Sequence, residues 1–245
     1  MSPNEKPLLG KRALVTGAAR RIGRELALSL ARAGADIAIT YKESSEQAHA
    51  TVQDLEACGV RALALRCDVR VEDEVQQVVE HLRTAWGGLD LLVNNAGLFE
   101  TAPLEEISVA QWDAIFETNT RGPFLVAKAC HALLKASRGR ILNIGSLGGL
   151  HPWATHGHYC TSKAGLHMLS QTMAKAWAPE ISVNCVAPGM IVNGEVDPTY
   201  EHFALKTPMG RNGRASDVAA AVLFFATGPH FITGQLLAVD GGLGL

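Results

Sequence analysis

The sequence predicts an α/β fold in which a doubly wound sheet of seven parallel strands carries helices on both faces. Short apolar segments alternate along the chain with segments whose apolar residues recur every three or four positions, as they do in helices. The apolar segments are continuous, which is typical of parallel strands buried on both faces. A length of 245 residues suits one large domain, and we expect residues 1–245 to form it.

Each apolar segment is an expected strand, and each periodic segment is an expected helix. The strands are predicted at 13–15, 36–40, 62–65, 91–93, 141–144, 181–186 and 236–239. The helices are predicted at 22–33, 44–57, 71–85, 109–135, 159–177 and 216–226. Ligands of such sheets bind beyond the carboxyl ends of the strands. The residues that fall at this edge include Gly17, Asp68, Asn94, Ser146 and Pro188.

The turn after the first strand reads TGAARRIG at 16–23 and leads into a helix and a second strand. Gly17 and Gly23 let the backbone approach a pyrophosphate at the helix N-terminus, where free N–H groups point. This β-turn-α-β context makes the glycine pattern more specific than the same letters elsewhere. We therefore expect a Rossmann-type dinucleotide-binding site.

A second group of chemically capable residues lies within 139–165. Ser146 follows the strand at 141–144, and Tyr159 and Lys163 lie further along the chain, four residues apart. Residues four apart share one face of a helix, so Tyr159 and Lys163 point the same way. An ammonium beside a phenol should lower the phenol's pKa below about 10, so Tyr159 could pass a proton to a substrate oxygen near neutral pH. Ser146 could donate a hydrogen bond to that oxygen.

Composition argues against several other functions. The net charge is −2 without a dense basic stripe, so we expect no nucleic-acid partner. The sequence has no apolar run of about 18 residues, and residues 1–11 lack the apolar core of a signal peptide. We therefore expect no membrane partner and a cytoplasmic location. The five cysteines form no C-x-x-C, which points to reduced thiols, and the nine histidines show no H-E-x-x-H, so we assign no metal.

The motifs together resemble those of the short-chain dehydrogenase/reductase family over nearly the whole chain, in the family's order and spacing. They are TGAARRIG, CDV, NNAG, the helix around Asn119, Ser146, YCTSK, APG and the terminal DGG. The resemblance implies that Tyr159 donates the proton and that Ser146 orients the carbonyl. It implies that Lys163 binds the nicotinamide ribose and lowers the Tyr159 pKa, and that Asn119 bends its helix and holds a water. The implied cofactor contacts are Gly17, Arg21, Ile22, Gly23, Asp68 near the adenine, Val69, Asn95, Ala96, Gly97, Tyr159, Lys163, Pro188, Gly189 and Ile191.

The expected cofactor is NADPH. Enzymes that prefer NAD place an acid at the end of the second strand, where it accepts hydrogen bonds from the adenosine ribose. Tyr41 occupies that place here, Lys42 follows it, and no carboxylate stands there. Arg20 and Arg21 lie in the facing turn, so cations can flank a 2′-phosphate. We predict that Arg20 and Lys42 bind this phosphate, with Tyr41 beside them.

Two positions depart from the family pattern. Arg21 stands where the family usually has glycine, a change shared with pteridine-reductase-like members. Asn193 stands where a threonine usually follows Pro188 and Gly189.

The residues expected to face a substrate are mostly apolar or aromatic: Phe99, Ser146, Trp153, Tyr159 and Met190. Ser146 favours an ordinary carbonyl substrate, such as a small ketone or a 3-oxoacyl thioester. Phe99 sits where pteridine-reductase-like enzymes stack an aromatic ring on the pterin, so a dihydropterin C=N bond is the alternative. A non-catalytic NADPH-binding sensor is the rival of another class, and the set of Asn119, Ser146, Tyr159 and Lys163 argues against it.

The helix predicted at 109–135 carries more apolar surface than one stripe facing its own sheet needs. Excess apolar surface on an outer helix usually meets a second subunit. Similar enzymes commonly pair these helices, so we expect a homo-oligomer, and specifically a tetramer.

Overall fold

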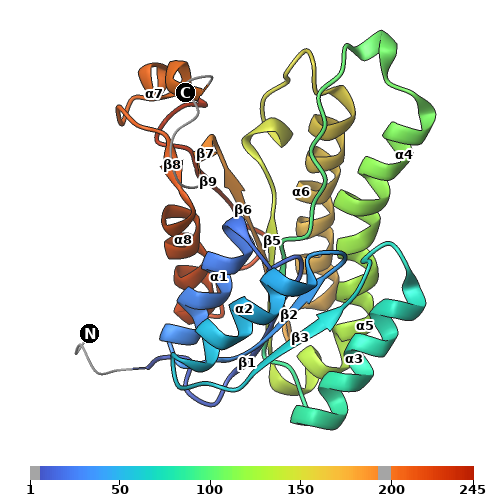
Figure 1. Cartoon of the computed structure of the whole chain (residues 1–245), viewed down its shortest axis with the longest axis vertical. Helices are drawn as coiled ribbons and strands as arrows, with labels where there is room; N and C mark the ends of the chain where they lie inside the picture. Colours follow the sequence, from blue (N-terminus) through green and yellow to red (C-terminus); the bar gives the residue numbers. More distant parts are fainter. Residues whose placement is uncertain (1–5, 193–199) are drawn as a thin grey trace.

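The computed structural model describes residues 6–192 and 200–245. Within them, one sheet contains seven parallel strands in the order β3-β2-β1-β4-β5-β6-β9 (Figure 1). The strands are β1 (Arg12–Val15), β2 (Asp36–Tyr41), β3 (Ala62–Arg66), β4 (Leu91–Asn94), β5 (Arg140–Ile144), β6 (Ser182–Pro188) and β9 (Leu236–Val239). All the expected strands are present within two residues of their predicted ends, which confirms the fold class.

Helices cover both faces of the sheet, as Figure 1 shows. One face packs against α1 (Arg21–Arg32), α2 (Ser45–Glu56) and α8 (Ala215–Thr227). The other packs against α3 (Glu72–Trp86), α5 (Gly122–Ser137) and α6 (Gly157–Trp177). The strand side chains divide accordingly, since Val15 and Ile37 join the first core while their neighbours Leu14 and Ala38 join the second.

The order of the strands reverses between β1 and β4, which are hydrogen-bonded neighbours. The chain moves outward from β1 through β2 to β3, and then returns to build the other half from β4 to β9. A reversal of this kind opens a crevice at the carboxyl edge of the sheet, where ligands of such folds bind.

The prediction of one continuous helix over residues 109–135 is wrong, because the structure has three helical segments there. α4 (Val109–Phe116) runs into the π-helical turn η2 (Glu117–Arg121), and α5 follows. The apolar period continues through all three, so the sequence pattern does not mark the turn. A π-helical turn re-aims the side chains on it, and such turns are frequent at functional sites.

Several short elements have no counterpart in the sequence-based prediction. They are η1 (Leu104–Glu106), η3 (Leu147–Gly149), α7 (Glu201–Lys206) and the two-stranded pair β7 (Ile191–Val192) and β8 (Gly213–Arg214). All are shorter than a window over which hydrophobic period can be read.

Candidate active site

Asn119 lies on the π-helical turn η2 and is fully buried. Its Oδ1 accepts a hydrogen bond from the backbone N–H of Leu98 at 2.8 Å, and its Nδ2 donates to the Leu98 carbonyl at 2.9 Å and to Ser162 Oγ at 3.1 Å. The turn thus joins the segment after β4 to helix α6. Asn119, which is expected to bend its helix, lies on this π-helical turn.

Lys163 is also buried, with 5% of its surface exposed. Its Nζ donates to the carbonyl of Ile144 at 2.9 Å and lies 5.9 Å from the centroid of the Tyr159 ring. A Cβ placed on Gly97 would lie 3.6 Å from Nζ and 3.4 Å from Asn119 Oδ1. Asn119, Lys163 and the backbone at Gly97 therefore converge on one small space. Burial lowers the pKa of Lys163 to about 8.

The structure does not support the expected lowering of the Tyr159 pKa by Lys163. Burial of the phenol raises the pKa of Tyr159, and the Ser146 hydroxyl opposes that rise only in part. The Lys163 ammonium points at the Ile144 carbonyl, and desolvation outweighs any charge effect on the ring. The prediction of a lowered pKa is therefore wrong for this arrangement, and Tyr159 carries its proton at neutral pH.

The Ser146 hydroxyl interacts both with the turn that follows it and with the Tyr159 side chain. Its Oγ accepts a hydrogen bond from the Gly148 N–H at 3.1 Å, within the turn η3. Its backbone N–H donates to His167 Nε2 at 3.3 Å. Burial, and then the charge of Lys163, lower the pKa of His167 to about 4, so the ring stays neutral and keeps its acceptor. Sequence reasoning missed His167, although its spacing of four from Lys163 places both on one face of α6.

Aromatic rings surround Tyr159. Phe99 meets it edge-on with ring centroids 4.8 Å apart, and Trp153 stacks at 6.3 Å. His156 completes the group, 4.9 Å from Phe99 and 5.6 Å from Trp153. Phe99 is 56% exposed, so it is available to a ligand. The structure thus brings Phe99 and Trp153, which the sequence analysis expects to face a substrate, into contact with the Tyr159 ring, together with His156.

The turn that contains Gly17 is held in place by hydrogen bonds from Asn95. Asn95 Nδ2 donates to the carbonyls of Thr16 at 2.9 Å and Gly17 at 3.0 Å. Gly17 has φ +62°, and a Cβ there would lie 2.8 Å from Cα of Ala96. Only glycine fits this close approach, so the two segments hold each other at the switch between β1 and β4.

The N-terminus of α1 fits an anion. Its first turn carries no acidic residue, and no side chain among the described residues caps it. Its backbone N–H groups therefore point outward without partners from caps, and Arg20 and Arg21 beside them are exposed. The N-terminus of α3 is the opposite case, with Glu72, Asp73 and Glu74 in its first turn. A pyrophosphate suits α1 and is repelled at α3.

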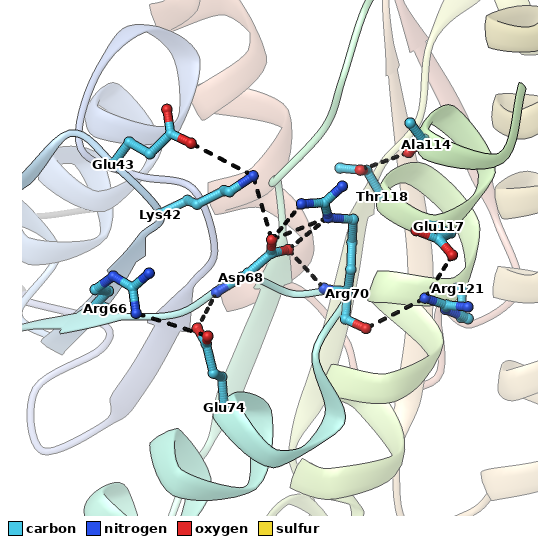
Figure 2. A network of polar contacts seen from close by, with 10 residues as sticks. All are labelled: Lys42, Glu43, Arg66, Asp68, Arg70, Glu74, Ala114, Glu117, Thr118 and Arg121. Carbon is cyan, nitrogen blue, oxygen red and sulfur yellow. Dashed lines mark hydrogen bonds and ion pairs between the residues drawn. The ribbon is translucent and has the colours of Figure 1, made fainter. Parts of the chain in front are cut away.

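Lys42 is paired with carboxylates. Its Nζ lies 3.4 Å from Asp68 Oδ2 and 3.6 Å from Glu43 Oε1 (Figure 2). The parallel register that pairs Tyr41 with Arg66 brings the end of β3 beside Lys42. Sequence reasoning considered only acids at the end of β2, and missed that Asp68 reaches Lys42 from the neighbouring strand.

Arg70 is a further partner of Asp68 that sequence reasoning missed. Its Nε donates to Oδ1 at 2.9 Å and its Nη2 to Oδ2 at 2.6 Å. The Arg70 guanidinium holds the pKa of the Asp68 carboxyl well below its usual range. Figure 2 shows Asp68 between the two cations.

The remaining predicted cofactor residues line the carboxyl edge of the sheet. Val69 is buried beside Gly122, and Tyr41 Oη accepts from Ser45 Oγ at 3.4 Å. Pro188 ends β6 and Gly189 donates to the Val239 carbonyl at 3.0 Å, which ties this loop to β9. Ile191 lies in β7, and the Met190 carbonyl accepts from Gly213. Ile22 and Gly23 lie in the first turn of α1. Asn193 lies outside the described residues.

The described residues meet neither the requirements of a membrane-spanning helix nor those of a metal site. Among residues 6–192 and 200–245, no helix has both the length and the apolarity to cross a bilayer. The same residues bring no three His, Cys, Asp or Glu side chains together as a metal site requires.

Comparison with known proteins agrees with this geometry. The family model described as "Enoyl-(Acyl carrier protein) reductase" matches residues 17–244. The chain is 37% identical to "3-oxoacyl-(acyl-carrier-protein) reductase FabG" of Staphylococcus aureus, over 95% of this chain and 98% of that one.

Solved structures are similar over the whole fold. A dehydrogenase/reductase from Sinorhizobium meliloti superposes with a TM-score of 0.93 at 38% identity, covering 98% of each chain. A short chain dehydrogenase from Burkholderia cenocepacia in complex with NADP superposes with a TM-score of 0.92 at 38% identity, covering 98% of this chain and 100% of that one. The protein is an oxidoreductase that belongs to the short-chain dehydrogenase/reductase family.

Proposed function

We propose that the protein reduces a carbonyl group to an alcohol with NADPH, and that small ketones or 3-oxoacyl thioesters are the substrate class. The carrying observation is the convergence of Ser146, the protonated Tyr159 and the buried Lys163 beside Asn119 at the carboxyl edge of the sheet. The name of the Staphylococcus relative and the NADP complex of the Burkholderia structure support the same chemistry.

Bound NADPH would supply a hydride for the carbonyl carbon. Tyr159 gives its phenolic proton to the carbonyl oxygen, and burial keeps that proton in place until the substrate arrives. The Ser146 hydroxyl, whose oxygen already accepts from Gly148, donates to the same oxygen. Lys163 holds the nicotinamide ribose, and Asn119 fixes the backbone around it.

The uncapped N-terminus of α1 supports this cofactor, because its free backbone N–H groups suit the pyrophosphate. Arg20 and Lys42 would bind the 2′-phosphate, with Arg21 and Tyr41 beside them, and Asp68 and Val69 would border the adenine. The other proposed contacts are Gly17, Ile22, Gly23, Asn95, Ala96, Gly97, Tyr159, Lys163, Pro188, Gly189 and Ile191. The ratio of kcat/KM for NADPH to that for NADH tests this assignment, and a preference for NADH contradicts it.

A dihydropterin is the second candidate substrate. The half-exposed ring of Phe99, set edge-on to Tyr159, could stack on a flat heterocycle. Arg21 also favours a dihydropterin, because pteridine-reductase-like members of the family have an arginine at this position of the glycine-containing turn. Ser146 argues for a carbonyl instead.

The experiment is a substrate panel with acetoacetyl thioesters, diketones and dihydrobiopterin, followed by the loss of NADPH absorbance. Turnover of thioesters or ketones supports the proposal, and turnover of dihydrobiopterin alone supports the second candidate. Tight NADPH binding without turnover across the panel favours a non-catalytic sensor.

We also propose that the chain forms a homo-oligomer, and specifically a tetramer, through its outer helices. Trp112 and Phe124 on α4 and α5 are 37% and 42% exposed. A groove of about 580 Å³ between these helices and α6 is lined by apolar and charged residues: Phe116, Phe124 and Leu169, with Asp113, Glu117 and Arg121. A sedimentation mass of 26.1 kDa at micromolar concentration contradicts this assembly.

A further inference from the structure

Asp68 is shared unequally by two cations. Arg70 donates to both of its oxygens with its side chain, and its backbone N–H donates to Oδ1 at 3.1 Å. Lys42 makes only a 3.4 Å contact to Oδ2. Arg70 is therefore the dominant partner of this carboxylate, because planar guanidinium contacts to both oxygens are shorter and better directed than a single ammonium contact.

The exposure of the three side chains shows which of them can move. The Asp68 side chain is 11% exposed and that of Arg70 is 30% exposed, whereas that of Lys42 is 47% exposed. A mostly buried carboxylate without a cation is strongly disfavoured. Because Arg70 alone can neutralise Asp68, Lys42 can move away from Asp68 without leaving a buried carboxylate unpaired.

The backbone at Asp68 is fixed independently of Arg70. Its N–H donates to Glu74 Oε2 at 2.8 Å, and Arg66 pairs with Glu74 at 3.8 Å on the far side (Figure 2). Removal of the Arg70 guanidinium therefore leaves the position of Asp68 supported while it removes the main counter-charge.

We propose that Arg70 is a positioning residue for recognition of the cofactor's 2′-phosphate: it holds Asp68, and so releases the Lys42 ammonium to pair with that phosphate. The inference rests on the proposed preference for NADPH. Without Arg70, Lys42 becomes the counter-charge of Asp68, and drawing it to a phosphate leaves the carboxylate unpaired. A dinucleotide that lacks the 2′-phosphate does not draw Lys42 away and is insensitive to this effect.

The test measures dissociation constants of NADP⁺ and NAD⁺ by titration calorimetry for the wild type, Arg70→Met, Arg70→Lys and Arg66→Met. Arg70→Met should reduce the preference for NADP⁺ by about fivefold, the upper range for one lost exposed charge pair, while NAD⁺ affinity stays within about twofold. Arg70→Lys, which keeps the charge, should restore most of the preference. Arg66→Met removes a neighbouring cation that does not touch Asp68, and should change neither constant.

A double variant separates this action from direct contact. Asp68→Asn removes the charge for which the two cations compete, so adding Arg70→Met to it should leave the NADP⁺ preference unchanged. A further loss of preference in the double variant means that Arg70 itself touches the phosphate, which overturns the inference. Should Arg70→Met fail to fold, Arg70→Gln carries the same test.

The other outcomes are equally decisive. An equal loss of affinity for both dinucleotides makes Arg70 a structural residue only, and an unchanged ratio leaves it without a role in recognition. Wild-type protein that prefers NAD⁺ contradicts the proposed cofactor, and that result comes from the wild type alone before any variant is compared.

Discussion

The two lysines at the carboxyl edge of the sheet lie in opposite surroundings. Lys42 is about half exposed and has carboxylates within 4 Å, whereas Lys163 is buried against a carbonyl and its pKa falls to about 8. The half of the sheet around β2 and β3 thus carries paired surface charges, whereas the half around β5 and α6 buries Lys163 and disfavours its charged form. This difference supports the proposed roles, in which one half recognises the cofactor's 2′-phosphate and the other transfers a proton.

The largest expected effect is the loss of turnover when the Tyr159 hydroxyl is removed from the buried half. Tyr159→Phe removes the proposed proton donor and keeps the ring contacts to Phe99 and Trp153, so we expect kcat to fall about 10³-fold with little change in NADPH affinity. Steady-state kinetics on the best substrate of the panel, with fluorescence titration of NADPH, measure both effects. Tyr200→Phe, which alters an exposed phenol, is the control. A variant that keeps wild-type turnover contradicts the assignment of the acid.

The neutral His167 makes the buried half sensitive to acid. Its pKa is about 4 in the fold against 6.5 in the unfolded chain, so between these values the unfolded state binds a proton that the folded state does not. Stability is therefore lost as the pH falls from 6.5 to 4, by about 3 kcal/mol for this residue. Denaturant unfolding at several pH values should show that His167→Gln flattens this slope. His81→Gln, an exposed change on α3, should leave it intact.

The lowered pKa of Lys163 predicts that NADPH binding weakens at alkaline pH. Above pH 8 the free protein loses the ammonium that we propose binds the ribose, so the dissociation constant of NADPH should rise by up to about tenfold per pH unit. Lys163→Met should bind weakly at all pH values and show no such rise, whereas Lys175→Met on the same helix should behave as the wild type. Constant affinity of the wild type between pH 7 and 9.5 is the contrary result.

The smallest expected effect is at the charged half, where Arg21 has φ +55° in the left-handed region. A residue with a Cβ is strained there by about 1–2 kcal/mol, and glycine is not. Arg21→Gly should therefore raise the free energy of unfolding by about 1 kcal/mol while it weakens NADPH binding. Arg20→Gly, at an extended φ of −157°, should bring no such gain in denaturant unfolding.

The fold was predictable because continuous apolar strands and periodic helices are visible in the sequence itself. The seven strands and most helix ends agree with the structure for this reason. The π-helical turn at Asn119 was not visible, because the apolar period runs on through it. What creates it is a set of contacts to Leu98 and Ser162 from distant parts of the chain.

The candidate site was predictable in its membership and not in its electrostatics. Motifs placed Ser146, Tyr159 and Lys163 together, but the pKa of Tyr159 depends on desolvation, which spacing does not reveal. Likewise, Arg70 and Lys42 meet at Asp68 only through the register of β2 and β3.

The most direct test of the division between the two halves is a crystal structure with NADP⁺ bound. We expect the 2′-phosphate beside Lys42 and Arg20, and the Tyr159 hydroxyl next to the reactive carbon of the nicotinamide with Lys163 on its ribose. A structure in which the Tyr159 hydroxyl faces bulk water or another subunit, away from the nicotinamide, contradicts the proposed chemistry even though the fold stands.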